Sequence, residues 1–86
     1  MGLTVIIDSI LWINNKIIQL KIINTKSYEL LVLTKNYTLI YIDEEGNKNN
    51  SVIFDFEPTC FEYDQINNKI LVGFVNGNIS ILDVRK

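Results

Sequence analysis

The stretch LLVLTKNYTLIYID, residues 30–43, lies on ILVGFVNGNISILD, residues 70–83, without a gap when the chain is shifted by 40 residues. Four pairs of positions are identical in the two copies: Leu31/Leu71, Val32/Val72, Asn36/Asn76 and Asp43/Asp83. Four further pairs keep an apolar side chain: Leu30/Ile70, Leu39/Ile79, Tyr41/Ile81 and Ile42/Leu82. Self-similarity at a fixed period is typical of repeat proteins, in which each copy is one supersecondary unit. The sequence therefore predicts two copies of one structural unit.

The composition of both copies favours β-strands. Runs of Ile, Val, Leu, Tyr, Phe and Thr alternate with clusters of Asn, Lys, Gly and Asp, a pattern typical of consecutive antiparallel strands. No window shows a 3.6-residue period without a turn signal inside it, so we predict no helix. Asn76-Gly77 predicts a type I′ hairpin turn with positive φ at both residues, and Tyr37 in the other copy is costly there. We predict strands at residues 3–7, 9–13, 16–23, 29–35, 38–43, 51–56, 59–64, 69–75 and 78–84.

Apolar residues occupy both faces of the expected strands. The runs at 30–33 and 79–84 do not alternate cleanly between apolar and polar side chains. A sheet with one face in water alternates, whereas a strand covered on both sides is a nearly continuous apolar run. We therefore expect each sheet to be packed between two neighbours.

These features resemble the WD-repeat β-propeller family, whose blades are four-stranded antiparallel sheets. Asn76-Gly77-Asn78 and Asn36-Tyr37-Thr38 occupy the place of the tight turn, and Asp83 and Asp43 match the closing Asp. Leu82 and Ile42 stand where Trp is usual, and the Gly-His pair and the turn Asp are missing. Kelch-like or other propellers with degenerate repeats therefore stay open as alternatives.

The resemblance implies an all-β fold of about two blades of an incomplete WD-type β-propeller. It divides the chain into residues 1–16, as strands of a preceding blade or an N-terminal cap, residues 17–56 as a blade, and residues 57–86 as a blade lacking its last strand. Propellers use about 4–8 blades. Two blades cannot close a ring, so we expect either a fragment of a longer protein or assembly with copies or partners through open strand edges.

Charge and hydropathy exclude several classes of partner. The formal net charge is −2, and Lys and Arg are scattered rather than clustered, which argues against nucleic-acid binding. The apolar stretch at residues 3–13 is too short for a membrane span and lacks the basic start of a signal peptide. Cys60, the one cysteine, excludes an internal disulfide. We expect a cytoplasmic protein that binds no membrane.

Catalytic and metal-binding residues have little support in the sequence. The chain has no histidine, and Cys60 therefore lacks the usual activating base of a thiol nucleophile. Under a 40-residue shift Cys60 aligns with the apolar Leu20, so we expect a buried core cysteine. Residues 43–47 lack the ligand spacing of a calcium loop. Asp55 with Glu57, and Glu62 with Asp64, are candidate carboxylate pairs on strand faces, for which exposed edge charge is the favoured interpretation.

We accordingly predict no catalytic, cofactor-binding or metal-binding residues and no enzymatic activity. The first functional hypothesis is a non-catalytic scaffold for protein–protein interaction, with a protein partner that the sequence does not identify. The alternative is a homo-oligomeric structural β protein whose copies complete the sheet or ring. Asp43 and Asp83 are expected to bond turn backbone. Five aromatic residues are candidates for an interface patch, although most are expected in the core: Trp12, Tyr28, Phe54, Phe61 and Phe74.

Overall fold

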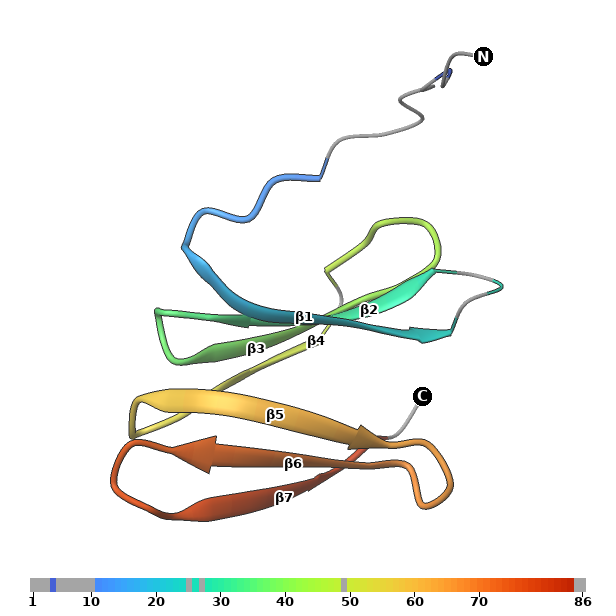
Figure 1. The fold of residues 1–86 in the computed structure, drawn as a ribbon. Helices are drawn as coiled ribbons and strands as arrows, with labels where there is room; N and C mark the ends of the chain where they lie inside the picture. The colour runs from blue at the N-terminus through green and yellow to red at the C-terminus, as the bar shows by residue number, and fades with distance from the viewer. Residues whose placement is uncertain (1–3, 5–10, 25, 27, 49, 85–86) are drawn as a thin grey trace.

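The computed structural model describes residues 4, 11–24, 26, 28–48 and 50–84, and these residues form two antiparallel sheets and no helix (Figure 1). The predicted all-β class is therefore confirmed. Sheet A has four strands in the order β1-β2-β3-β4, and sheet B has three in the order β5-β6-β7. The strands of both sheets are β1 Ile17–Asn24, β2 Glu29–Thr34, β3 Thr38–Ile42, β4 Asn50–Ile53, β5 Pro58–Asp64, β6 Lys69–Phe74 and β7 Ile79–Asp83.

Two of the predicted strands differ from the structure, and a third lies almost entirely outside the described residues. The strand predicted at 3–7 lies outside the described residues apart from Thr4. Of the strand predicted at 9–13, only residues 11–13 are described, and they are not in a strand. The strand predicted at 51–56 corresponds to β4, which ends at Ile53. Phe54 N–H still donates to Tyr37 O at 2.8 Å, and beyond this hydrogen bond the chain crosses to sheet B.

The backbone repeats with the period of the sequence. Positive φ recurs at Tyr28 (52°) and Asn68 (53°), and again at Tyr37 (59°) and Gly77 (88°). The Asn76-Gly77 turn is nevertheless not type I′, because φ is positive at Gly77 alone. Gly77 N–H donates to Phe74 O and Phe74 N–H to Asn78 O, each at 3.0 Å, so the loop is a three-residue turn that ends in a left-handed residue.

A β-bulge changes the register of the first strand pair in each sheet. Ile17 pairs with Thr34 and Gln19 with Leu33, while Pro58 pairs with Phe74 and Cys60 with Gly73. When the two copies are compared under the 40-residue shift, the extra residue of β5 therefore lies one position after the extra residue of β1. The prediction of a buried Cys60 is therefore wrong: Cys60 takes the place of Gln19 rather than Leu20, and it is exposed. Phe61, 1% exposed, takes the core position.

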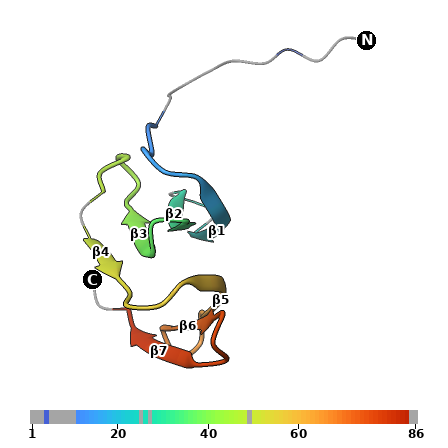
Figure 2. The same cartoon turned by 90° about the vertical axis from the view of Figure 1, so that its left-hand side faces the viewer.

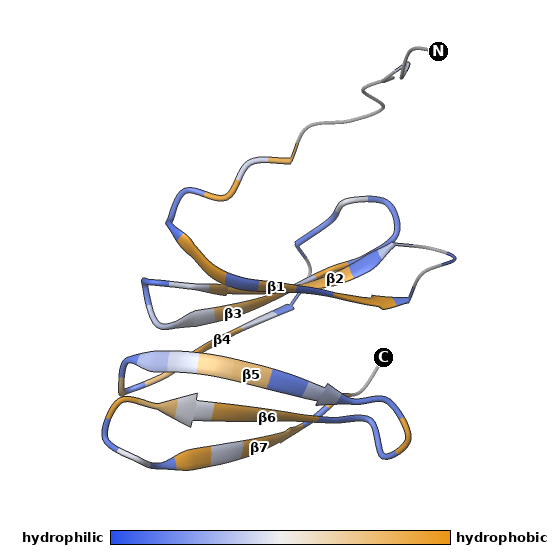
Figure 3. Ribbon diagram, in the orientation of Figure 1, coloured by the Kyte–Doolittle hydropathy of each residue, from blue (hydrophilic) through white to orange (hydrophobic). Residues whose placement is uncertain are grey.

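The hydrophobic core lies between the two sheets, which are stacked face to face (Figure 2). Apolar residues run along the strands of both sheets (Figure 3). Those that meet in the core are Leu31, Leu33 and Leu39 from sheet A, and Phe61, Ile70, Val72 and Phe74 from sheet B. Burying apolar side chains of this size contributes about 1.5–3 kcal/mol each, so this interface is the main source of stability among the described residues.

Burial on both faces is confirmed for β2 of sheet A but not for β7 of sheet B. Residues 31–34 of β2 are all buried, although successive side chains point to opposite faces. In β7, by contrast, Ile79 is 69% and Ile81 is 66% exposed, whereas Leu82 packs against the core. The expectation for residues 79–84 therefore fails on one face, because none of the described residues forms a layer over the far side of sheet B.

One side chain joins the backbones of the two sheets. The Gln19 amide on β1 donates from Nε2 to Phe61 O at 2.8 Å and accepts from Phe61 N–H at Oε1 at 2.9 Å. Phe61 lies on β5, which pairs with β6 on its other side, so Gln19 satisfies both backbone groups on the outer edge of β5. Lys21 adds an ion pair with Glu62 at 2.8 Å, but this pair is exposed to water.

Replacing Gly77 tests the turn geometry. A Cβ at Gly77 would meet no atom within 4 Å, so Gly77→Ala adds backbone strain without a clash. We expect it to lower the free energy of unfolding by about 1 kcal/mol, the cost of a left-handed L-residue. Gly73→Ala is the matched control, because its Cβ would meet only ordinary contacts, the nearest being Cys60 Sγ at 3.4 Å. Urea denaturation measures the free energy of unfolding of both variants, and equal values would contradict the left-handed conformation assigned to Gly77.

Removing the amide of Gln19 tests the link between the sheets. Gln19→Leu leaves the Phe61 N–H and C=O without their partner, and we expect the free energy of unfolding to fall by about 1–3 kcal/mol. Lys21→Met removes the neighbouring exposed ion pair and should cost less than about 1 kcal/mol. Both values come from chemical denaturation. A Gln19→Leu variant no less stable than Lys21→Met would show that the amide link is dispensable.

Candidate functional site

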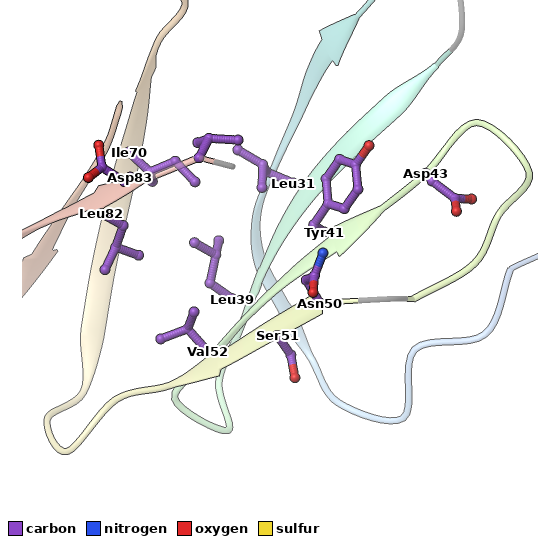
Figure 4. A pocket seen from close by; sticks show the side chains of 11 residues that line it. Leu31, Leu39, Tyr41, Asp43, Asn50, Ser51, Val52, Ile70, Leu82 and Asp83 are labelled. Carbon is purple, nitrogen blue, oxygen red and sulfur yellow. The ribbon is translucent and has the colours of Figure 1, made fainter. Parts of the chain in front are cut away.

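A cleft of about 550 Å³ opens between the sheets, on the side where sheet A has β4 (Figure 4). Its apolar wall is formed by Leu31, Leu39, Val52, Ile70, Leu82 and Val84. Leu39 and Val52 point into it from sheet A, and Leu82 from sheet B. Sheet B ends at β7, so no fourth strand of sheet B lies opposite β4 among the described residues. The unequal number of strands therefore leaves this side of the core open.

A buried carboxylate lies beside this cleft and is held by polar neighbours. Glu29 at the start of β2 is 8% exposed. Its Oε2 accepts from Asn24 Nδ2 at 2.8 Å, and its Oε1 accepts from the hydroxyl of Tyr41, a cleft residue. That hydrogen bond, followed by burial and the negative charge of Glu29, raises the pKa of Tyr41 to about 12. These three residues brace the end of sheet A, because both oxygens of a charge removed from water are satisfied.

The structure does not assemble the candidate carboxylate pairs. Asp55 and Glu57 lie in the connection between the sheets, not on a strand face as predicted. Glu62 and Asp64 do lie on β5, but Glu62 pairs with Lys21, while Asp64 accepts from the amides of Ile66 and Asn67 in the following turn. The Asn67 side chain, more than the backbone, lowers the pKa of Asp64. Each carboxylate of the β5 pair therefore has its own local partner.

The two closing acids have different structural roles. Asp43 Oδ1 accepts from Glu45 N–H at 3.0 Å and Asn47 N–H at 2.9 Å, which confirms the predicted bonding of turn backbone. Asp83 forms an ion pair with Lys69, its cross-strand partner in β6. Both line the cleft, yet in Figure 4 their carboxylates lie at opposite ends.

The candidate aromatic residues divide between core and surface. Phe61 and Phe74 are 1% and 7% exposed, and Phe54 packs edge-on against Phe74 with ring centroids 5.2 Å apart. Trp12 is 76% and Tyr28 67% exposed. They belong to different segments, the first preceding β1 and the second joining β1 to β2.

A second, smaller cleft of about 350 Å³ follows the connection between the sheets. It is lined by Ile53, Phe54, Asp55 and Phe56 from the connection, and by Phe74, Asn78, Ile79 and Ser80 from sheet B. Sequence reasoning identified neither cleft, nor Gln19, Glu29 and Asn24. The one feature of the sequence that could have pointed to these residues is a polar residue within an otherwise apolar strand, as at Gln19.

No family model, curated protein or solved structure matches this chain. Among the described residues, no group of three or more His, Cys, Asp or Glu side chains could hold a metal ion. A search of the same residues for a helix long and apolar enough to span a membrane finds none.

The pKa of the Tyr41 hydroxyl tests the polar brace, the hydrogen-bonded group of Asn24, Glu29 and Tyr41. Because Glu29 favours the neutral phenol in the folded protein, the stability that this group contributes is present below pH 10 and is lost as the pH rises toward 12. Glu29→Gln should bring the pKa of Tyr41 down toward its ordinary value of 10. NMR titration of the ¹³Cζ signal measures it, with Glu45→Gln in the exposed loop as control. An unchanged Tyr41 pKa in Glu29→Gln would contradict this cause.

Proposed function

We propose that the chain is part of a WD-type β-propeller and acts as a non-catalytic scaffold for protein–protein interaction. Sheets A and B would be two successive blades, the second of them with three of its four strands. The scaffold holds its partner on rigid sheets and turns and needs no reacting group. The partner is a protein, consistent with the scattered positive charge and the acidic balance of the sequence.

One observation carries this proposal: the open face of sheet B repeats the face by which sheet A binds sheet B. Leu31 and Leu39 pack into the core between the sheets. Their counterparts in the repeat, Leu71 and Ile79, are 39% and 69% exposed on the far face of sheet B. An exposed apolar surface that repeats a buried one is typical of a surface that another protein layer covers.

The far face of sheet A supports the alternative, a homo-oligomer of this chain. Leu20 and Ile22 on β1 are 49% and 45% exposed, and Leu20 takes the place that Phe61 has in sheet B. A second copy could therefore place its sheet A on the open face of sheet B with the geometry of the existing interface. Such head-to-tail contacts close into a ring when their rotation allows.

Adding positive charge to the open face of sheet B tests both the scaffold function and the homo-oligomer. Ile79→Lys with Ile81→Lys should leave stability within about 0.5 kcal/mol, because both side chains face water. Ile66→Lys, at a turn residue that is 94% exposed, is the matched control. In affinity capture, the scaffold function predicts bound proteins that the double variant loses and the control retains.

Sedimentation of the same variants separates the two functions. A defined trimer or tetramer of the wild type, which the double variant dissociates, would favour the homo-oligomer. A wild-type chain that stays monomeric and captures the same proteins as the double variant would contradict both functions at this face.

A further inference from the structure

The far face of sheet A, the face turned away from sheet B, is buried at its centre. Val32 on β2 is 0% and Ile42 on β3 is 2% exposed, yet neither belongs to the core cluster between the sheets. Successive side chains of a strand point to opposite faces, so these two point away from Leu31 and Leu39, which do belong to it. Among the described residues no strand lies on this side of sheet A (Figure 2). Another part of the chain therefore covers Val32 and Ile42.

Comparison with sheet B shows how much of this face is covered. Val72, the counterpart of Val32, is buried because it packs in the core against sheet A. Phe61 on β5 is buried in the same way, whereas Leu20, which has its place on β1, is half-exposed, as is Ile22. The cover of the far face therefore extends over β2 and β3 and leaves part of β1 open. A narrow segment fits this pattern better than a complete sheet.

The chain that precedes β1 reaches the same side of sheet A. The loop of residues 43–48, which follows β3, rises from sheet A on the side away from sheet B (Figures 1 and 2). A Cβ at Gly46 of this loop would lie 3.0 Å from Leu11 Cδ2. Lys48 Nζ, from the same loop, donates to Trp12 O. Residues 11 and 12 are thus held against the loop that borders the far face.

Alternation of side chains indicates which residues before Leu11 would face sheet A. Leu11 points at the loop, whereas Trp12 is exposed. Thr4 is exposed as well, and in an extended segment it shares the side of Trp12. The charge of Asp8 falls on that same side. The residues on the side of Leu11 are Val5, Ile7 and Ser9. The inward side of an extended segment would therefore be mainly apolar, as the far face of sheet A is.

We propose that residues 5–11 lie extended across β2 and β3 on the far face of sheet A and cover it with Val5, Ile7 and Leu11. At about 3.3 Å per residue this segment spans about 20 Å, enough to cross both strands, which lie about 5 Å apart. The inference goes beyond the scaffold function, because it assigns this face to the chain itself and leaves a partner the other surfaces. In a propeller, the segment would belong to the layer that precedes sheet A.

A nitroxide label on the full chain tests where the segment lies. The label is attached to the cysteine of Ile6→Cys, on the outward side, in a chain that also carries Cys60→Ser. We expect it to broaden the methyl NMR signals of Val32 and Ile42, and to leave those of Ile79 on the far face of sheet B sharp.

Two controls accompany the nitroxide label. A label at Ile66→Cys, in the exposed turn of sheet B, should not broaden the signals of Val32 and Ile42. Mixing nitroxide-labelled chains with isotope-labelled chains that carry no nitroxide separates contact within a chain from contact between chains. We expect no broadening in the mixture, because the segment covers the face of its own chain.

A pair of adjacent substitutions tests which side of the segment faces sheet A. Ile7→Asp should raise the relaxation that a soluble nitroxide causes at the methyl groups of Val32 and Ile42 at least about threefold, because a carboxylate at an apolar face is too costly to bury. Ile6→Asp makes the same change one residue earlier, on the outward side, and should leave this relaxation unchanged. The methyl groups of Val72, which lie between the sheets, are the internal reference, and circular dichroism checks that both variants are folded.

Two results would overturn the proposal: sharp signals of Val32 and Ile42 with the label at Ile6→Cys, or equal effects of Ile7→Asp and Ile6→Asp. Broadening in the mixture of chains would assign the far face to a second copy instead. The label at Ile6→Cys decides the matter even where Ile7→Asp fails to fold. None of these results bears on the scaffold function, which the capture experiment on the open face of sheet B tests separately.

Discussion

The packing of sheet A against sheet B is the constraint on which the described fold depends. A single antiparallel sheet of three or four strands leaves apolar side chains on at least one face, and here the two sheets cover each other with Leu31, Leu33, Phe61 and Val72. Packing alone allows sheets to slide. The two hydrogen bonds between Gln19 and the Phe61 backbone fix the offset, because they require one residue to lie opposite one edge position.

Much of the fold could be predicted from the 40-residue period, since a period records which residues have the same environment. It located β2 and β6 to within one residue at each end and placed the two hairpins in register. The period could not show the bulge in β5, because a bulge depends on cross-strand pairing rather than on local composition. One slipped residue was enough to place Phe61 rather than Cys60 opposite Val72, on the face of β5 that packs against sheet A.

The clefts and the polar brace could not be predicted for a different reason, because they depend on contacts that the two copies of the repeat do not have in common. Glu29 and Tyr41 correspond to Lys69 and Ile81 in the second copy, so the brace exists in one sheet only. The larger cleft exists because β4 has no counterpart beside β7 among the residues that the structure describes. The residues that mark the candidate site are therefore those that break the repeat, and self-similarity along the sequence does not identify them.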